Sequence, residues 1–324
     1  MFLYGLQAFT REIQAVGGDT LRGWLARLTS TPLRGVLLGA VATAIVQSSS
    51  AVVALAISLV NSGILTFLSS LGIVLGANVG TTSTAWLISM RLTDIGPFFI
   101  VLGTILSVLP WRISILGKAA FYFGFIFFGL ELVGGTLKPL AQTPVFEDMI
   151  RRAGVPVMGV AVGVLLTALV QSSTIVTGLC IVMVQQQVLT AQAAIPIVIG
   201  TNIGTTLKGL LITIGMQRTA RRVAFANIVF NTIGVLLILP FLRPFAASMA
   251  NLSKDPGIGV AWAQFLFNLA MTIVGLAVVR IFRKQLLTID SGTAAGIDPV
   301  AADSARPREK PDIPGWDRPY PSKP

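Results

Sequence analysis

The chain has 324 residues, of which 54% are hydrophobic and only 11% are charged, and its mean hydropathy is +0.81. This composition excludes an ordinary soluble domain and predicts an all-α polytopic membrane protein. The chain has no histidine and one cysteine, which excludes an imidazole metal site, a Ser-His-Asp hydrolase and an internal disulfide. Although the formal net charge is +11, the basic residues lie between apolar runs, as topology signals do, so we expect no nucleic-acid partner.

The first apolar segment, residues 1–28, contains charged residues such as Arg11, Glu12 and Arg22. Its counterpart in the second half of the chain is a full apolar helix. We therefore expect the first span to be short or partly interfacial.

The next apolar stretch, residues 33–60, has four uncharged polar residues at its centre, namely Gln47, Ser48, Ser49 and Ser50. Two geometries are compatible with it: one full helix with a polar patch, or two half-helices that meet at the polar residues and return to the side they entered. We favour the re-entrant hairpin, because irregular backbone at membrane depth is tolerated only where it lines a site.

Residues 64–90 form a further span that contains the sequence Gly-Ala-Asn-Val-Gly-Thr-Thr at 76–82. Two glycines beside Asn78, Thr81 and Thr82 are what an unwound transmembrane helix with usable carbonyl and hydroxyl groups needs. We therefore predict a broken helix here. Apolar runs at 95–109 and 118–135 are expected to be the next spans.

Both motifs return in the second half at a constant shift of 124 residues, so that Gln171 corresponds to Gln47. Residues 39–82 and 163–206 align without a gap, and about 20 of the 44 residue pairs are identical. The sequence therefore predicts two repeats, 1–110 and 157–284, joined by a connecting span and loop at 111–156. The second repeat has its hairpin at 157–186, its broken helix at 189–216 and spans at 223–242 and 260–279, and residues 285–324 are predicted to be a disordered tail.

The two repeats could be parallel or inverted. If both polar stretches re-enter, Lys and Arg divide about 12 against 6 between the two sides and the repeats are inverted; if both span, the division is about 14 against 4 and the repeats are parallel. We favour inversion, because interrupted segments at matching positions of two repeats suit a two-fold axis in the membrane plane.

The polar residues that recur in the two repeats are Gln47, Ser48, Ser49 and Ser50 with Gln171, Ser172, Ser173 and Thr174, and Asn78, Thr81 and Thr82 with Asn202, Thr205 and Thr206. Small polar residues often serve only helix packing, but packing does not require the same clusters at the same places in both copies. Neutral oxygens suit Na⁺, and helix N-termini suit an anion. Two such clusters meeting near the midplane would bind an anion with its coupling cations, as in a secondary transporter. Asn227, Asn231 and Asn268 are expected to form interhelical hydrogen bonds.

The doubled pattern of Gln-Ser-Ser followed by Gly-x-Asn-x-Gly-Thr-Thr resembles the type II sodium/phosphate cotransporters and their bacterial relatives, over about residues 5–231. The resemblance implies that the two Gln-Ser clusters line a phosphate site at the tips of paired hairpins. It also implies that the Asn and Thr residues of the second motif help to bind sodium, and that the protein is a homodimer. The expected function is sodium-coupled symport of inorganic phosphate across the cell membrane, with Na⁺ as the co-transported ion and no other cofactor.

Several features depart from this family pattern. The first span is short, and no counterpart of the regulatory domain of many bacterial relatives is apparent. Lys208 stands where the first repeat has Thr84; it is either a snorkelling lysine near a helix end or a cation that replaces one Na⁺ or contacts the anion. Glu131, an acid inside the predicted span 118–135, either pairs structurally or couples a cation.

Two other functions are compatible with parts of the sequence. An intramembrane hydrolase would use Ser172 or Ser173 activated by Lys208, but this leaves the first copy of the motif unused. A non-transporting phosphate sensor would use both copies. Phosphate flux into proteoliposomes with and without a sodium gradient distinguishes these two from a transporter.

Overall fold

The computed structural model describes residues 31–90, 96–109, 111–141 and 155–287, together with four isolated positions, and these residues form helices and short turns. In chain order the helices are α2 (Pro32–Val46), α3 (Ser49–Asn61), α4 (Phe67–Ser89), α5 (Gly96–Ser107), α6 (Trp111–Ala141), α8 (Pro156–Val170), α9 (Ser173–Gln185), α10 (Ala191–Ile212), α11 (Arg218–Ile238), the 3₁₀ turn η2 (Leu239–Phe241), α12 (Leu242–Ala250) and α13 (Pro256–Ile281). The predicted first span and nearly all of the predicted tail lie outside the described residues, while residues 285–287 are helical.

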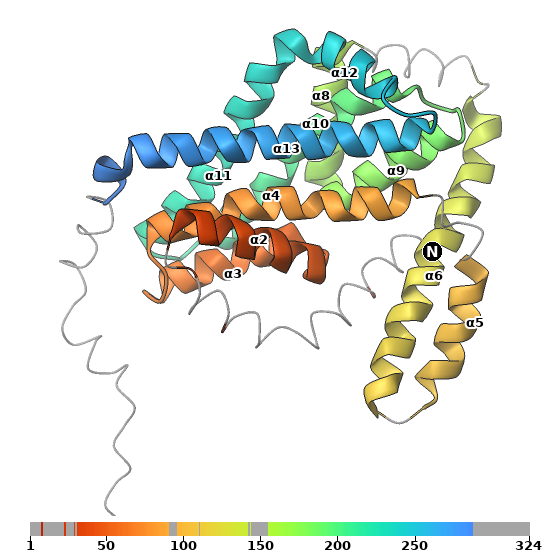
Figure 1. The fold of residues 1–324 in the computed structure, drawn as a ribbon, viewed down its shortest axis with the longest axis horizontal. Helices are drawn as coiled ribbons and strands as arrows, with labels where there is room; N and C mark the ends of the chain where they lie inside the picture. Colours follow the sequence, from red (N-terminus) through yellow and green to blue (C-terminus); the bar gives the residue numbers. More distant parts are fainter. Residues whose placement is uncertain are drawn as a thin grey trace, which may run out of the picture.

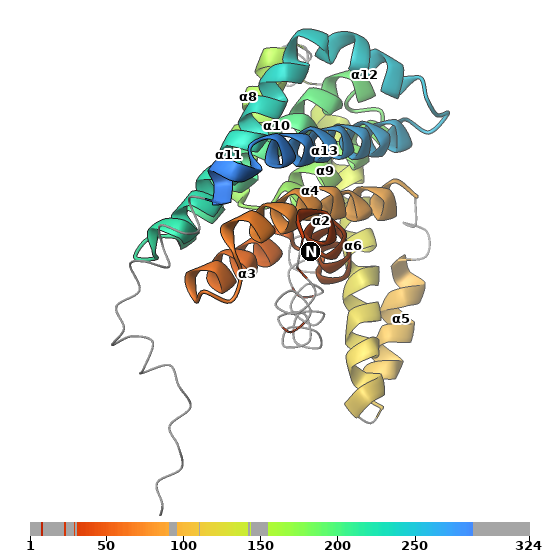
Figure 2. The same ribbon diagram turned by 60° about the vertical axis from the view of Figure 1, so that its left-hand side comes forward.

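The long helices α4 and α13 lie side by side, with α2 and α3 next to α4 and with α8, α9 and α10 beyond them (Figures 1 and 2). The helices α5 and α6 form a separate pair that projects from one end.

The helix is interrupted at both Gln-Ser motifs. Helix α2 ends before Gln47, whose backbone is left-handed with φ 56°, and Ser48 is extended and begins the next helix by accepting a hydrogen bond at Oγ from the N–H of Ala51 at 3.3 Å. Gln171, with φ 57°, and Ser172 repeat this geometry between α8 and α9. A left-handed backbone is uncommon for a residue other than glycine. A single helix through either stretch is therefore not what the structure has.

Helix α2 packs along α4 through a row of glycines at four-residue spacing. A Cβ on these glycines would overlap a backbone carbonyl oxygen of α2, in the pairs Gly72 with Pro32, Gly76 with Val36 and Gly80 with Ala40. Because the partners ascend together, α2 and α4 run in the same direction. In the second half, α8 and α10 repeat the arrangement, with Gly200 against Val160 and Gly163 against Ile197.

The predicted breaks in the two long helices are wrong. Helix α4 is continuous through 76–82 and α10 through 200–206. The glycines serve close helix packing, for which small residues are required. The threonine hydroxyls also bond inside the helix, since Thr81 donates to the carbonyl of Ala77 at 2.9 Å and Thr82 to that of Val79 at 2.7 Å.

Two hydrogen bonds at corresponding positions link the two halves. The side-chain Oδ1 of Asn61, at the end of α3, accepts from the N–H of Gln217 at the start of α11 at 2.9 Å. The side chain of Gln185, at the end of α9, donates to the carbonyl of Ser89 at the end of α4 at 3.1 Å. Asn61 and Gln185 are related by the same shift of 124 residues. The last residue of α3 and the last residue of α9 are thus each hydrogen-bonded to the other half of the chain.

Helix α13 packs against α4 in the first half and against α10 in the second. Trp262, near its start, meets Trp86 of α4 edge-on with ring centroids 4.9 Å apart. Further along, the hydroxyl of Thr272 donates to the carbonyl of Leu75 in α4 at 3.1 Å. The two helices therefore run in opposite directions, and α13 ends where α4 begins.

Four helical segments in the described part of the chain are long and apolar enough to cross a membrane. They are Phe67–Ser89, Ala191–Ile212, Arg218–Ala250 and Pro256–Ile281. The shorter helix α2 also exposes an apolar row, formed by Leu33, Leu37, Val41 and Ile45. Exposed apolar surface of this extent is what a lipid environment tolerates.

Candidate functional site

One cavity brings together polar residues of both motifs and both halves of the chain. Its volume is about 430 Å³ including the opening, and its lining residues are Ser49, Ser50, Val53, Asn78, Thr81, Ser173, Asn202, Thr205, Thr206, Gly209 and Asn227. All of these side chains are uncharged. The predicted convergence of two polar clusters from the two repeats thus has a counterpart in the geometry of the molecule.

The helices α3 and α9 both begin at this cavity. Ser49 and Ser173 are their first residues, and both line the cavity. The N–H groups of the first helical turn have no partner within the helix, and the helix dipole places partial positive charge there. Because Ser48 and Ser172 cap only the third N–H of each helix, the first two N–H groups of α3 and of α9 stay available to an anion.

The long helices present oxygen atoms to the same cavity. The hydroxyl of Thr81 donates to the carbonyl of Ala77, and the hydroxyl of Thr205 donates to that of Thr201, both at 2.9 Å. Since the hydroxyl proton is used inside the helix, the oxygen lone pairs remain available to a ligand. Asn202 donates its side-chain N–H to its own helix at the carbonyl of Ile199, which leaves Oδ1 as an acceptor. Neutral oxygens of this kind are ligands for a hard cation such as Na⁺.

Gln47 does not line the cavity but holds the first hairpin tip against α4. Its Oε1 accepts a hydrogen bond from the hydroxyl of Thr84, and its Nε2 donates to the hydroxyl of Ser83 at 3.3 Å. Gln171 lacks this support and is exposed, because the corresponding positions of α10 are Leu207 and Lys208. The two hairpin tips therefore differ in how firmly they are attached.

The other predicted site residues lie outside the cavity lining. Thr174 is half-buried in the first turn of α9, and the hydroxyl of Thr82 donates within α4. Lys208 is half-buried, and the described residues offer it no hydrogen-bond or ion-pair partner. Glu131 is in α6, and its side chain lies outside the described part of the structure.

Asn227 is a cavity residue that the sequence interpretation treated only as an interhelical hydrogen bonder. It comes from α11, outside both recurring motifs, and only 5% of its surface is exposed. The available signal was its spacing of four residues from Asn231, which places both side chains on one face of a helix. That spacing alone does not show which face meets the cavity.

Long apolar helices packed around an uncharged polar cavity define a helical membrane protein with a polar interior site. The family model described as "Na+/Pi-cotransporter" matches residues 1–135 and again residues 133–281. The chain belongs to this family of phosphate transport proteins.

Several relatives are similar over most or part of the chain. The uncharacterized protein YqeW of Bacillus subtilis is 28% identical over 88% of this chain and 94% of its own length. The putative inorganic phosphate export protein YjbB of Escherichia coli is 28% identical over 89% of this chain, which spans only 54% of that protein. The human sodium-dependent phosphate transport protein 2B is 33% identical over 39% of this chain and 20% of its own length. No solved structure matches the chain significantly.

Proposed function

We propose that the protein is a sodium-coupled secondary transporter of inorganic phosphate in the cell membrane. The observation that supports this most is the shared cavity, to which the hairpin helices α3 and α9 and the long helices α4 and α10 all contribute uncharged polar groups. Phosphate transport also agrees with the family and with the names of the E. coli and human relatives.

Coupling follows from the chemistry of an uncharged site. Burying a phosphate dianion or a sodium ion alone is costly, because no side chain of opposite charge lines the cavity. When both bind, each neutralises part of the charge of the other. We assign the anion to the N–H and hydroxyl groups at Ser49, Ser50 and Ser173, and the cations to the oxygens of the Asn and Thr residues. Binding energy shared in this way couples the two solutes reciprocally.

We further propose that the two repeats are inverted and that both hairpins re-enter the membrane from opposite sides. In support, α2 runs with α4 and α8 runs with α10, while the end of α3 is bonded to the start of α11 and the end of α9 to the end of α4. These contacts favour an arrangement in which α4 and α10 point in opposite directions. Rocking of one repeat against the other would then expose the cavity to each side in turn.

A homodimer, which the family resemblance implies, is retained as part of the proposal. The helix α5 leaves Phe98, Val101 and Ile105 exposed, which suits contact with lipid or with a second copy.

The test is uptake of radiolabelled phosphate into proteoliposomes. We expect uptake to be driven by an inward sodium gradient, to be absent with a potassium gradient of equal size, and to reverse direction when the gradient is reversed. Gln47→Ala and Gln171→Ala should each reduce the flux. Phosphate movement that is indifferent to sodium would overturn the coupling, and no phosphate movement would overturn transport itself. Labelling by a serine-reactive probe would favour the hydrolase instead.

A further inference from the structure

Three asparagine side chains form a continuous hydrogen-bonded chain between α4 and α11. The Nδ2 of Asn78 donates to the Oδ1 of Asn231 at 3.3 Å. The Nδ2 of Asn231 donates to the Oδ1 of Asn227 at 2.8 Å and to the backbone carbonyl of Asn227 at 2.9 Å. Both ends of this chain, Asn78 and Asn227, line the cavity, whereas the middle residue does not.

The direction of the chain is fixed by the backbone. A carbonyl oxygen can only accept a hydrogen bond, so the atom of Asn231 that faces the carbonyl of Asn227 must be the amide nitrogen. The oxygen of Asn231 then faces Asn78, which must donate. The same nitrogen of Asn231 meets the oxygen of Asn227, so the Asn227 nitrogen points away from Asn231.

The two ends of the chain consequently have opposite character. At Asn78 the free group is an oxygen, which suits a cation, and at Asn227 it is an NH₂ group with two donors, which suits an anion. Within the described part of the chain, neither the Asn78 Oδ1 nor the Asn227 Nδ2 has a hydrogen-bond partner. Asn227 is 95% buried and lines the cavity, so an anion in the cavity would accept hydrogen bonds that no described residue accepts from its NH₂ group.

We propose that Asn227 binds the transported oxyanion through its side-chain N–H groups, and that Asn231 is the positioning residue that fixes their orientation. This inference rests on the proposed function and adds a residue of α11 to the anion site. The three hydrogen-bonded asparagines also connect an acceptor on the cation side to a donor on the anion side. A change in the orientation of the Asn78 side chain would therefore change that of Asn227 through the amide group of Asn231.

Asn227 and Asn231 have no counterparts in the first half of the chain. At the shift of 124 residues, the positions that correspond to Asn227 and Asn231 are Gly103 and Ser107 of α5, a helix that packs against α6. Asn202, the counterpart of Asn78, bonds instead to its own helix. The anion site is therefore asymmetric although the repeats correspond.

The experiment compares Asn227→Ser with Asn268→Ser in proteoliposomes. Asn268 is a matched control, because it is also a buried asparagine that donates to a helix carbonyl, that of Gln264, but it lies outside the cavity lining. For Asn227→Ser we expect the phosphate concentration at half-maximal flux to rise about tenfold, the scale of a lost hydrogen bond to a charged group, with little change in the sodium dependence. Asn227→Asp, which keeps the shape but replaces the donors by negative charge, should raise it further. Asn268→Ser should leave it unchanged.

Positioning by Asn231 is tested with Asn231→Leu in two backgrounds. We expect this change to raise the half-maximal phosphate concentration in the parent protein but not in Asn227→Ser, because a residue that acts through another has no separate effect. Additive effects would remove the positioning role.

An unchanged phosphate dependence in both Asn227 variants, in a parent protein that transports phosphate with sodium, would overturn the inference while the proposed function stands. A parent protein without sodium-dependent flux would overturn the proposed function itself. Should a flux variant fail to assemble, phosphate-induced thermal stabilisation of the purified variant in detergent gives the same comparison.

Discussion

Gln47 and Gln171 share the same left-handed backbone but have different surroundings. Gln47 is anchored by Ser83 and Thr84, whereas Gln171 is exposed next to Leu207 and Lys208. The repeat is apparent from residues that are identical in the two halves. The difference arises because Ser83 and Thr84 of α4 correspond to Leu207 and Lys208 of α10. At the scale of single residues the two halves are therefore not equivalent.

This asymmetry predicts unequal effects of the two glutamine substitutions on stability. We expect Gln47→Ala to lower the free energy of unfolding by about 1–2 kcal/mol, since it leaves the buried Thr84 hydroxyl without its acceptor. Gln171→Ala should have an effect near zero. Thermal unfolding of the two purified variants measures the difference, and equal losses would contradict it.

Lys208 gives a second prediction at this scale. It is a half-buried cation without a partner among the described residues, at the position where the first repeat has Thr84. We expect Lys208→Thr to change the sodium dependence of phosphate flux, because the ammonium group of Lys208 would otherwise occupy the place of one Na⁺. Lys254→Thr, an exposed lysine between α12 and α13, is the control. An identical sodium dependence in both variants would remove the role of Lys208.

Much of the candidate site could be predicted from the sequence, because the same polar residues recur in two copies. Ser49 and Ser173 line the cavity with Asn78, Thr81, Asn202, Thr205 and Thr206, as the recurrence suggested, whereas the predicted Gln47, Gln171, Thr82 and Thr174 do not. Asn227 could not be assigned, because it has no counterpart in the first repeat. A residue that acts from one half alone leaves no repeat signal.

At the scale of the elements, the glycines of α4 and α10 account for the main error in the predicted fold. Glycine is compatible with a broken helix and with close helix packing, and the sequence alone does not distinguish the two. Gly76 and Gly200 lie against the carbonyl oxygens of Val36 and Val160, so they serve packing. The interruptions that do occur, at Gln47 and Gln171, are stabilised by the serine caps that follow them.

The packing role predicts a clear contrast between two glycines of α10. Gly200→Ala places a Cβ where the Val160 carbonyl oxygen lies, so we expect a loss of about 1–3 kcal/mol in the free energy of unfolding. Gly209→Ala meets nothing within 4 Å and should gain up to about 1 kcal/mol from helix propensity. Thermal unfolding in detergent provides the comparison. A Gly200→Ala protein as stable as Gly209→Ala would show that the helices do not pack this closely.

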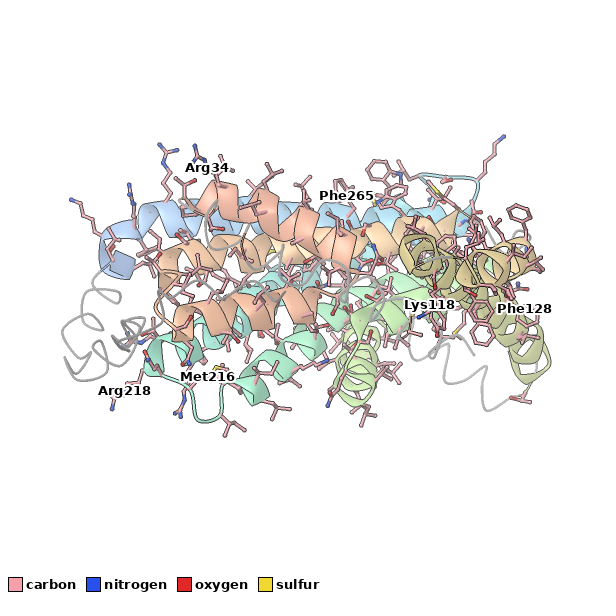
Figure 3. All side chains as sticks on the ribbon, turned by 90° about the horizontal axis from the view of Figure 1, so that it is seen from below. Arg34, Lys118, Phe128, Met216, Arg218 and Phe265 are labelled. Carbon is pink, nitrogen blue, oxygen red and sulfur yellow. The ribbon has the colours of Figure 1, made fainter. Side chains whose placement is uncertain are left out.

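For the whole molecule, the basic residues at the helix ends indicate its orientation. Figure 3 shows Arg34 and Arg218 at the same end of the long axis, as the inverted arrangement expects. In the count of about 12 against 6 for inverted repeats, Lys118 of α6 belongs to the same side as these two arginines, but it lies toward the other end in this view. The count assumes that the predicted spans 95–109 and 118–135 each cross the membrane. The corresponding helices α5 and α6 form a separate pair whose placement depends on packing that the sequence does not reveal.

Orientation can be tested by the accessibility of single cysteines. In a Cys180→Ala background, Arg34→Cys and Arg218→Cys should react with an impermeant thiol reagent from one side of the membrane and Lys254→Cys from the other, since α13 begins where α4 ends. The basic end should be the cytoplasmic one. Reaction of Arg34→Cys and Arg218→Cys from opposite sides would exclude the inverted arrangement.

The proposed function depends most on one anion site shared by the two hairpins, and equilibrium binding of phosphate to the purified protein tests this directly. With sodium present we expect one phosphate per chain, and we expect either Ser49→Ala or Ser173→Ala alone to weaken that single binding event about tenfold. Two phosphates per chain, or binding that one of these substitutions leaves unchanged, would contradict the shared site.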